Sequence, residues 1–217
     1  MQAIQVTAGS LASASNNNIC TAQQPLAAGA LTLNGALVSG GIAKLGQNRR
    51  VLFTTTGNET GKSVLVTGTD YNGNVQTDTV ALPNNSTAYT DLDFLTVTSI
   101  TISAAAAANL TVGTNGVGGS RWVRFNDFAP SNISIQCDVT GTVNYTVQAT
   151  LDDPNDPFNP TTAENVVWVN SSDAAVVASS STQQSNFLFT PKYAKILINS
   201  GSGSVKATFL QSSNGPR

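Results

Sequence analysis

The stretch LDDPNDPFNP, residues 151–160, holds the densest group of side chains in this sequence that could do chemistry. It contains Asp152, Asp153 and Asp156, three of the twelve acidic residues, together with three of the eight prolines. Carboxylate and amide oxygens on one loop are the ligands that calcium prefers. The glycine-turned spacing of a calcium loop is missing, however, and the prolines stiffen the backbone. We therefore keep the three aspartates as candidate calcium ligands but favour a rigid, solvated connection, since Asp and Pro are also common turn residues.

Catalytic arrangements find little support elsewhere in the sequence. The chain has no histidine, which excludes Ser-His triads and zinc–histidine sites. No Gly-x-Ser-x-Gly elbow occurs, and the glycine-rich stretches lack the lysine of a phosphate loop. Glu59 and Glu164 could be nominated as a glycosidase pair, but nothing in the sequence places them in one cleft. We predict a protein that is not an enzyme, with no catalytic residues and no cofactor.

Aromatic residues in RWVRFNDF, residues 121–128, offer a binding surface as an alternative. Trp122, Phe125 and Phe128 are interleaved with arginines, an arrangement that could stack on a sugar or a base. On a strand, Trp122 and Arg124 point to one face while Phe125 points to the other, which splits the apparent cluster. This separation favours a core tryptophan over a carbohydrate or base platform.

The remaining aromatic and reactive side chains are predicted to be structural. Trp168 lies in VVWVN, with valines on both sides, and is predicted to be a core residue. Cys20 and Cys137 are the only cysteines, and their separation matches no metal-ligand spacing and no dense disulfide framework. We expect both to be reduced and to behave as small hydrophobic residues.

Composition limits the classes of partner. Charged residues make up 10% of the chain and the formal net charge is −2, whereas about 25% charged residues is usual for soluble domains. The ten basic residues are scattered, which argues against nucleic-acid binding. No stretch approaches the roughly 20 apolar residues that span a bilayer, and the N-terminus lacks the pattern of a signal peptide. We expect no membrane partner and synthesis in a cytoplasm without export by that route.

The chain alternates Val, Thr, Ile and Phe with polar residues between Gly, Asn and Pro, a pattern typical of antiparallel β-strands. The Asn72-Gly73 pair, between two alternating runs at 63–70 and 75–82, is the strongest hairpin signal. The strands are predicted at 31–34, 49–56, 63–70, 75–82, 95–103, 109–114, 121–125, 132–139, 142–151, 166–170, 175–180, 187–190, 194–200 and 204–211. We predict an all-β fold.

Domain boundaries follow from the glycine-rich stretch NGVGGS at 115–120. We predict an extended N-terminal arm over residues 1–23, a β-sandwich domain over 24–118 and a second, jelly-roll-like β-sandwich domain over 119–217. Both domains are antiparallel sandwiches or barrel-like sheets, joined by the glycine-rich linker. The arm is expected to order on binding to a neighbour, and exposed edge strands favour a homo-oligomer.

One resemblance goes beyond what composition indicates. The run that includes SVLVTGTDYNGNVQTDTV and continues through LTVTSITISAAAAANLTVGTNGVGG resembles a recurrent module of tailed-bacteriophage virion structural proteins. TGTVNYTVQATLDDPNDPFNP and AKILINSGSGSVKATFLQ are similar to its continuation in such proteins. The resemblance covers about residues 24–212 and contains no catalytic motif.

The resemblance implies a non-enzymatic virion protein, in the first place a capsid decoration or cement protein that binds and stabilises the outer shell. Its partners would be the major capsid protein or other virion proteins, on particles assembled in the bacterial cytoplasm. The alternatives are a collar, head–tail connector or tail component, or a carbohydrate-binding β-module. The sequence leaves open the position on the virion, the host, the oligomeric state, and whether the loop at 152–160 binds an ion or a neighbouring subunit.

Overall fold

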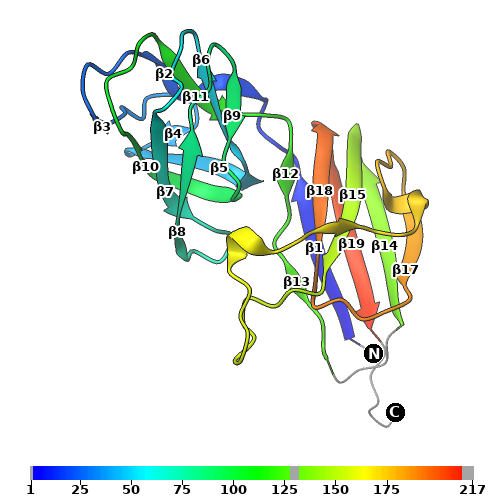
Figure 1. Cartoon of the computed structure of the whole chain (residues 1–217). Coiled ribbons are helices and arrows are strands. Elements are labelled where there is room, and N and C mark those ends of the chain that lie inside the picture. Colours follow the sequence, from blue (N-terminus) through cyan, green and yellow to red (C-terminus); the bar gives the residue numbers. More distant parts are fainter. Residues whose placement is uncertain (1, 128–131, 212–217) are drawn as a thin grey trace. The chain divides into compact units, whose positions relative to one another are not determined.

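The computed structural model describes residues 2–127 and 132–211, and its regular elements are antiparallel β-strands and two short 3-10 helices (Figure 1). The strands form open sheets and not closed barrels. The all-β, antiparallel prediction is therefore confirmed. Within the described ranges, no helix has the length and apolar character needed to cross a membrane.

The chain divides into two compact units, which are described separately. Unit 2 is continuous and comprises Ala12–Val117, whereas unit 1 combines the segment up to Leu11 with the segment from Gly118 onwards. Unit 2 is thus inserted between the first strand of unit 1 and the rest of that unit. The border at Val117 lies close to the boundary predicted from the glycine-rich stretch.

Unit 2 consists of two sheets, with strand orders β2-β11-β6-β9 and β5-β10-β7-β8, and the short strands β3 and β4 pair with β10 and β5. Its strands are β2 (Ser15–Gln23), β3 (Gly29–Ala30), β4 (Val38–Ser39), β5 (Ile42–Arg49), β6 (Val51–Thr55), β7 (Ser63–Thr69), β8 (Val75–Ala81), β9 (Thr87–Tyr89), β10 (Phe94–Ile102) and β11 (Leu110–Thr114).

The core of unit 2 is built from alternate residues of both sheets. In β7, Val64 and Val66 are buried while Leu65 between them is exposed, as the two-residue period of a strand requires. Phe53 from one sheet and Phe94 from the other belong to the same buried cluster. Each such side chain stabilises the fold by about 1.5–3 kcal/mol when fully buried.

The predicted hairpin is confirmed, but its turn differs in detail from the expected one. β7 and β8 pair from Thr69 opposite Val75 onwards. Gly73 alone of the turn residues has a positive φ, +84°, and its amide donates to the carbonyl of Asp70. The Asp70 carboxylate accepts from the amides of Asn72 and Asn74. Only the glycine of the Asn-Gly pair therefore needs the left-handed conformation.

Unit 1 also consists of two sheets, with strand orders β1-β19-β14-β17 and β16-β15-β18, and the short strands β12 and β13 both pair with β18. Its elements are β1 (Gln2–Gly9), β12 (Gly118–Gly119), β13 (Val123–Arg124), β14 (Ile133–Thr140), β15 (Val143–Thr150), η1 (Ala163–Asn165), β16 (Val169–Asn170), η2 (Ala174–Val176), β17 (Gln183–Phe187), β18 (Tyr193–Gly201) and β19 (Ser204–Gln211).

Two tight connections lead the chain of unit 1 from one sheet to the other, between β14 and β15 and between β18 and β19. The two connections are in contact, because the amide of Gly203 donates a hydrogen bond to the carbonyl of Thr142. A Cβ atom on Gly203 would lie 2.4 Å from the carbonyl oxygen of Thr140. Glycine is required there because the two backbones approach too closely for a side chain.

The core of unit 1 joins the inner faces of its two sheets. Its cluster contains Val143, Tyr145 and Val147 of β15 and Phe187 and Phe209 of the opposite sheet. The rings of Phe187 and Phe209 are nearly parallel, with centroids 6.5 Å apart. This arrangement is sandwich-like, as the sequence predicted.

Several sequence-based expectations differ from the structure, among them the strand predicted at 31–34, where the chain forms no strand. Residues 2–9 and 15–23 of the predicted arm are strands β1 and β2, paired with β19 and β11. Gly118 and Gly119 of the predicted linker form β12, which pairs with β18. The strand predicted at 175–180 is absent, because Asp173 caps the 3-10 helix η2 by accepting a hydrogen bond from the amide of Ala175.

Candidate functional site

The loop that connects β15 to β16, residues 151–168, carries the three aspartates singled out from the sequence. Asp153 is the most deeply placed, with 6% of the residue exposed. Its Oδ2 atom lies 3.2 Å from Nη2 of Arg124, and its Oδ1 atom accepts hydrogen bonds from the amide of Asn155, at 2.9 Å, and from the hydroxyl of Tyr193, at 3.3 Å. The Asp153 carboxylate therefore anchors the loop to the sheet beneath it, because Tyr193 belongs to β18.

Asp152 and Asp156 bind backbone amides of the same loop. Oδ2 of Asp152 accepts from the amide of Val167 at 2.7 Å, which ties the start of the loop to its end. Oδ1 of Asp156 accepts from the amides of Phe158, at 2.8 Å, and Asn159, at 2.9 Å. The hydrogen bonds from Asn159 and Phe158, with a smaller contribution from the charge of Lys192, lower the pKa of Asp156 below its usual value.

The three carboxylates thus point to different donors and do not converge on one point. Among the residues that the structure describes, no three His, Cys, Asp or Glu side chains gather closely enough to hold a metal ion. A calcium site would need several oxygens directed at a common centre. The geometry supports a rigid connection whose acidic groups fix its conformation, although Asp153 is buried and not solvated as expected.

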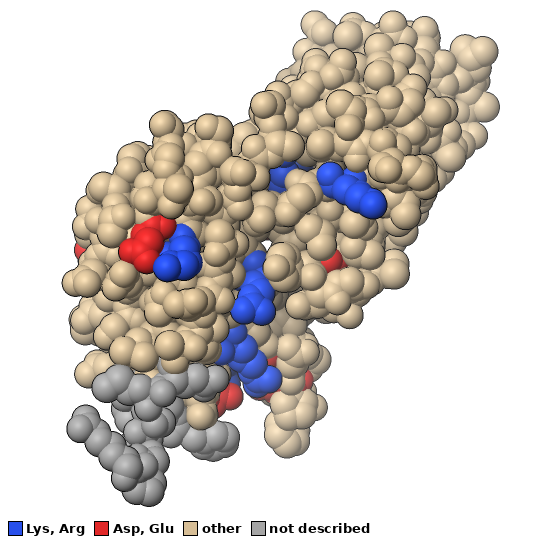
Figure 2. Space-filling model, turned by 180° about the vertical axis from the view of Figure 1, so that it is seen from behind, with Lys and Arg blue, Asp and Glu red and all other residues tan. Residues whose placement is uncertain are grey.

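The charges around the loop are paired with one another. Besides binding Asp153, Nη2 of Arg124 lies 3.8 Å from Oδ2 of Asp127, and Nζ of Lys192 lies 3.0 Å from Oδ1 of the same residue. The space-filling view shows few charged side chains on the face that it presents, in small groups on an otherwise uncharged surface (Figure 2). A partner that meets this loop would therefore need no strong complementary charge.

Several apolar side chains of the loop and of β16 are exposed, whereas Asp153 of the same loop is buried. Phe158 is 86% exposed and Leu151 is 67% exposed, and Val167 and Val169 are exposed as well. A loop of ordinary composition turns its charged side chains to water and its apolar ones inward, because burial of apolar area is favourable. Here Asp153 is buried while Leu151 and Phe158 of the same segment are exposed. Exposed apolar groups concentrated in this way are typical of a protein-interaction site.

An apolar pocket adjoins this exposed group. It has a volume of about 200 Å³ and is lined by Leu151 and Val169 at the two ends of the loop and by Phe187 and Phe189. Phe187 is part of the core, whereas Phe189 is exposed. We use the name apolar surface of unit 1 for the pocket with its exposed lining residues Leu151, Val169 and Phe189, and for the exposed side chains of Phe158 and Val167 on the same loop.

An aromatic cluster holds the end of the loop against the outer face of the sheet. The ring centroids of Trp122 and Trp168 are 5.0 Å apart in an edge-to-face arrangement, and Trp122 meets Tyr193 edge to face at 5.9 Å. Nζ of Lys195 lies 4.4 Å from the centroid of Trp168. Such contacts stabilise a fold by about 0.5–1.5 kcal/mol for each aromatic pair. Their geometry presents no pair of coplanar rings for a sugar to stack on.

The separation of the aromatic strip expected from strand geometry is confirmed. Phe125 is buried in the core of unit 1, where it meets the rings of Phe187 and Phe209, whereas Arg124 lies over the ring of Tyr193, 6.0 Å from its centroid. The prediction that both tryptophans are core residues is wrong, since both are partly exposed. Phe128 lies outside the described residues.

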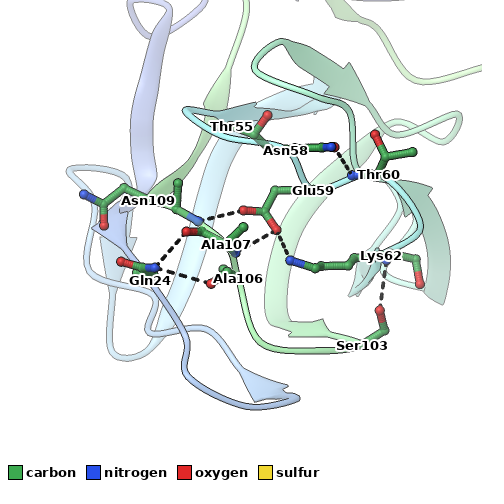
Figure 3. Close-up of polar contacts among 12 residues, drawn as sticks. Gln24, Thr55, Asn58, Glu59, Thr60, Lys62, Ser103, Ala106, Ala107 and Asn109 are labelled. Atoms are coloured by element: carbon green, nitrogen blue, oxygen red, sulfur yellow. Dashed lines mark hydrogen bonds and ion pairs between the residues drawn. The ribbon is translucent and has the colours of Figure 1, made fainter.

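Glu59 is the one acidic residue of unit 2 that is completely buried (Figure 3). Its carboxylate lies 2.6 Å from Nζ of Lys62 and accepts hydrogen bonds from the amides of Ala107, at 3.1 Å, and Ala108, at 2.9 Å. Burial acts to raise the pKa of Glu59, but these three donors outweigh it and lower the pKa. Glu59 therefore fixes the loop of small residues after β10. The side chain of Glu164, its nominated partner, lies outside the described part of the chain.

The two cysteines are buried and free, as predicted. Burial raises the pKa of Cys20 to about 12 and that of Cys137 to about 11. Thiols that are neutral at all physiological pH values are poor nucleophiles and poor metal ligands. Both cysteines therefore behave as core residues.

A second depression, of about 610 Å³, lies over strands β14, β17 and β19 of unit 1. Its lining consists mainly of uncharged polar side chains, among them Gln136, Gln184, Asn186 and Thr208. None of the described residues that line it has an ionisable side chain for acid–base chemistry.

No family model, curated protein or solved structure matches the chain.

Proposed function

We propose that this protein is a non-enzymatic virion structural protein of a tailed bacteriophage, a capsid decoration or cement protein, which docks on a neighbouring virion protein through the apolar surface of unit 1. The observation that carries the proposal is the exposure of large apolar side chains on the loop after β15, next to an apolar pocket. The aspartates of this loop bind amides and Arg124, while Phe158 and Leu151 are left in water. Exposed apolar side chains are unfavourably solvated in the isolated chain. That free energy is regained when a partner covers them.

The chemistry of the surface supports a structural role. The ion pairs of Arg124, Asp127 and Lys192 neutralise the charges beside the loop, so copies packed closely on a particle would repel one another little. The partner, the major capsid protein or another virion protein, would supply apolar side chains to the pocket. The resemblance of the sequence to phage virion proteins supports the particle as the place of assembly, on the capsid surface or in the head–tail region.

The first experiment is the copy number of this chain in purified phage particles, measured by quantitative mass spectrometry against the major capsid protein. A value in the hundreds supports decoration of the shell. A value near six or twelve moves the protein to the collar, the head–tail connector or the tail. Absence from particles refutes the proposal.

A second experiment tests the docking surface itself. Purified protein is added to particles that lack it, and the bound fraction is measured by co-sedimentation. Replacing Phe158 by serine should weaken binding at least tenfold, about 1.4 kcal/mol. The matched control is Leu26→Ser, which removes an equally exposed apolar side chain from unit 2 and should leave binding unchanged. Equal binding by both variants would exclude the apolar surface of unit 1 as the docking site.

A further inference from the structure

Strand β8 is the outermost strand of its sheet in unit 2. It pairs with β7 on one side in unbroken register, from Val75 opposite Thr69 to Ala81 opposite Ser63. Among the described residues, no strand pairs with its other side. The strand is exposed along this edge, and Val75 is 76% exposed.

The hydrogen bonds at the two ends of the hairpin show which backbone groups face the open side. The amide of Leu82 donates to the carbonyl of Lys62 at 2.9 Å, and the amide of Asp70 donates to the carbonyl of Asn74 at 3.0 Å. In an antiparallel pair, hydrogen-bonded and non-hydrogen-bonded residue pairs alternate. The even-numbered residues of β8 therefore bond to β7. The odd-numbered residues, Val75, Thr77, Thr79 and Ala81, direct their N–H and C=O groups to the open edge.

Of the features that usually prevent strands from pairing, this edge has only an inward-facing charge, Asp78, which is already bonded within its own chain. Natural sheet edges are commonly blocked by a proline, a lysine, a bulge or a very short strand. The sequence of β8, VQTDTVA, contains neither proline nor lysine, and its register with β7 has no shift. Its only charged residue is Asp78, whose Oδ2 atom accepts hydrogen bonds from the amides of Asp91, at 2.6 Å, and Leu92, at 2.9 Å.

The outer strands of the other sheet of unit 2 are closed in different ways. The outer edge of β2 is occupied, because the carbonyl of Ile19 accepts from the amides of Asn34 and Gly35 and the carbonyl of Asn18 accepts from the amide of Leu37. At the opposite edge, β9 is only three residues long. Strand β8 is longer than β9 and, unlike β2, has an open edge.

We propose that β8 pairs with β8 of a second copy of this chain, in an antiparallel, two-fold arrangement that joins the two sheets into one. A row of alternating N–H and C=O groups is complementary to itself under two-fold symmetry, so an identical strand fits this edge without any other partner. The formal net charge of −2 per chain adds little repulsion between copies.

The side chains of β8 favour one register for this pairing. A two-fold axis at Asp78 would place two carboxylates directly opposite each other, which is destabilising. An axis at Thr77 instead places Thr77 opposite its own copy, Val75 opposite Thr79, and Gln76 opposite Asp78. In this register no carboxylate lies opposite another, since Asp78, bonded to the amides of Asp91 and Leu92, faces Gln76, whose Nε2 donates to the carbonyl of Asp93 in its own chain. The odd-numbered residues form the hydrogen-bonded pairs. We infer that Thr77 lies on the two-fold axis.

A cross-linking experiment tests the register. Residues in a hydrogen-bonded antiparallel pair have Cα atoms about 5.5 Å apart, which suits a disulfide. Thr77→Cys should therefore form an intermolecular disulfide under mild oxidation and run as a covalent dimer. The control is Thr101→Cys, since Thr101 is exposed in the central strand β10 and aligns through Leu65 with Thr79 on the same face of the sheet. Cross-linking of neither variant, or of both equally, would overturn the proposal.

Sedimentation analysis tests the dimer without a new cysteine. The wild type should show a concentration-dependent equilibrium between monomer and dimer. Thr79→Pro removes an N–H that points to the open edge and no bond to β7, so the fold should persist, as circular dichroism would verify. The dissociation constant of this variant should rise at least tenfold. The inference would be contradicted if the wild type stayed monomeric at every soluble concentration or formed assemblies larger than a dimer. It would also be contradicted if the proline variant had the same dissociation constant as the wild type. This inference does not depend on the proposed virion role.

Discussion

Replacing Glu59 by glutamine should destabilise unit 2 strongly, although no partner or substrate is involved. The Glu59 carboxylate is fully buried and accepts three hydrogen bonds, from Nζ of Lys62 and from the amides of Ala107 and Ala108. Hydrogen bonds to a charged group each contribute about 1.5–3 kcal/mol. Glutamine retains one acceptor oxygen but loses the charge, and its amide group would confront one of these donors. Because the side chain of Lys62 is 21% exposed and can turn to water, we expect a loss of about 3 kcal/mol, below the largest values for broken buried pairs.

The assay is urea unfolding followed by circular dichroism, supported by calorimetry. A loss of about 3 kcal/mol in a unit of roughly 100 residues should lower the melting temperature by at least about 10 °C. The control is Asp91→Asn, which makes the same acid-to-amide change at an exposed residue of unit 2 and should alter stability by less than about 0.5 kcal/mol.

The dependence on pH gives an independent test of the same contact. Because the pKa of Glu59 in the folded protein lies below its ordinary value of 4.5, its contribution to stability is complete above that value. The contribution is lost as the pH falls through the lowered pKa of the folded state. The stability difference between wild type and Glu59→Gln should therefore be constant near neutral pH and shrink in acid. A loss under about 0.5 kcal/mol, or a difference independent of pH down to the acid transition, would refute the reasoning.

Three further predictions concern unit 1. Ala178 has a φ of +51°, a conformation that glycine adopts without strain. Ala178→Gly should therefore stabilise the protein by up to about 1 kcal/mol in urea unfolding. A destabilised variant would show that the strain argument is wrong. Gly203→Ala should cost at least about 2 kcal/mol, since its Cβ would lie 2.4 Å from a carbonyl oxygen across the connection, and unchanged unfolding would contradict the close approach. Calcium should leave the melting temperature within about 1 °C of its value in EDTA, because the three aspartates of the loop bind amides, Arg124 and Tyr193; a larger rise would revive the calcium hypothesis.

The strands that local pattern predicted well are those whose two faces differ in environment. In β14, Ile133, Ile135 and Cys137 are buried and alternate with exposed Ser134 and Gln136, so the sequence shows the period of a strand directly. The β7–β8 hairpin was equally accessible from sequence, because its turn chemistry is local. These elements need no knowledge of the rest of the chain.

The N-terminal segment shows how a correct signal can be overlooked. Ile4, Val6 and Ala8 alternate with Gln5 and Thr7, the same two-residue period. Their small size and the polar surroundings made the segment resemble an arm, but β1 aligns with β19 over its whole length. A strand whose partner lies some 200 positions away cannot be recognised from its neighbours in sequence, since strand pairing is a long-range property.

By itself, the sequence determined the class of the protein: an all-β chain of low charge, without histidine, whose cysteines are buried and whose turns carry Asp, Asn and Gly. These properties follow from residue types and short-range periodicity. The tertiary structure alone decided that β1 pairs with β19, near the other end of the chain, and that the carboxylates of Asp152, Asp153 and Asp156 bind donors within the protein. It also decided that Trp122 and Trp168 meet and that β8 ends its sheet with an open edge. The direction of a loop side chain depends on which hydrogen-bond donors the packed sheets bring near it. From sequence alone, the carboxylates in a run of Asp and Pro could equally bind water, an ion or a backbone amide.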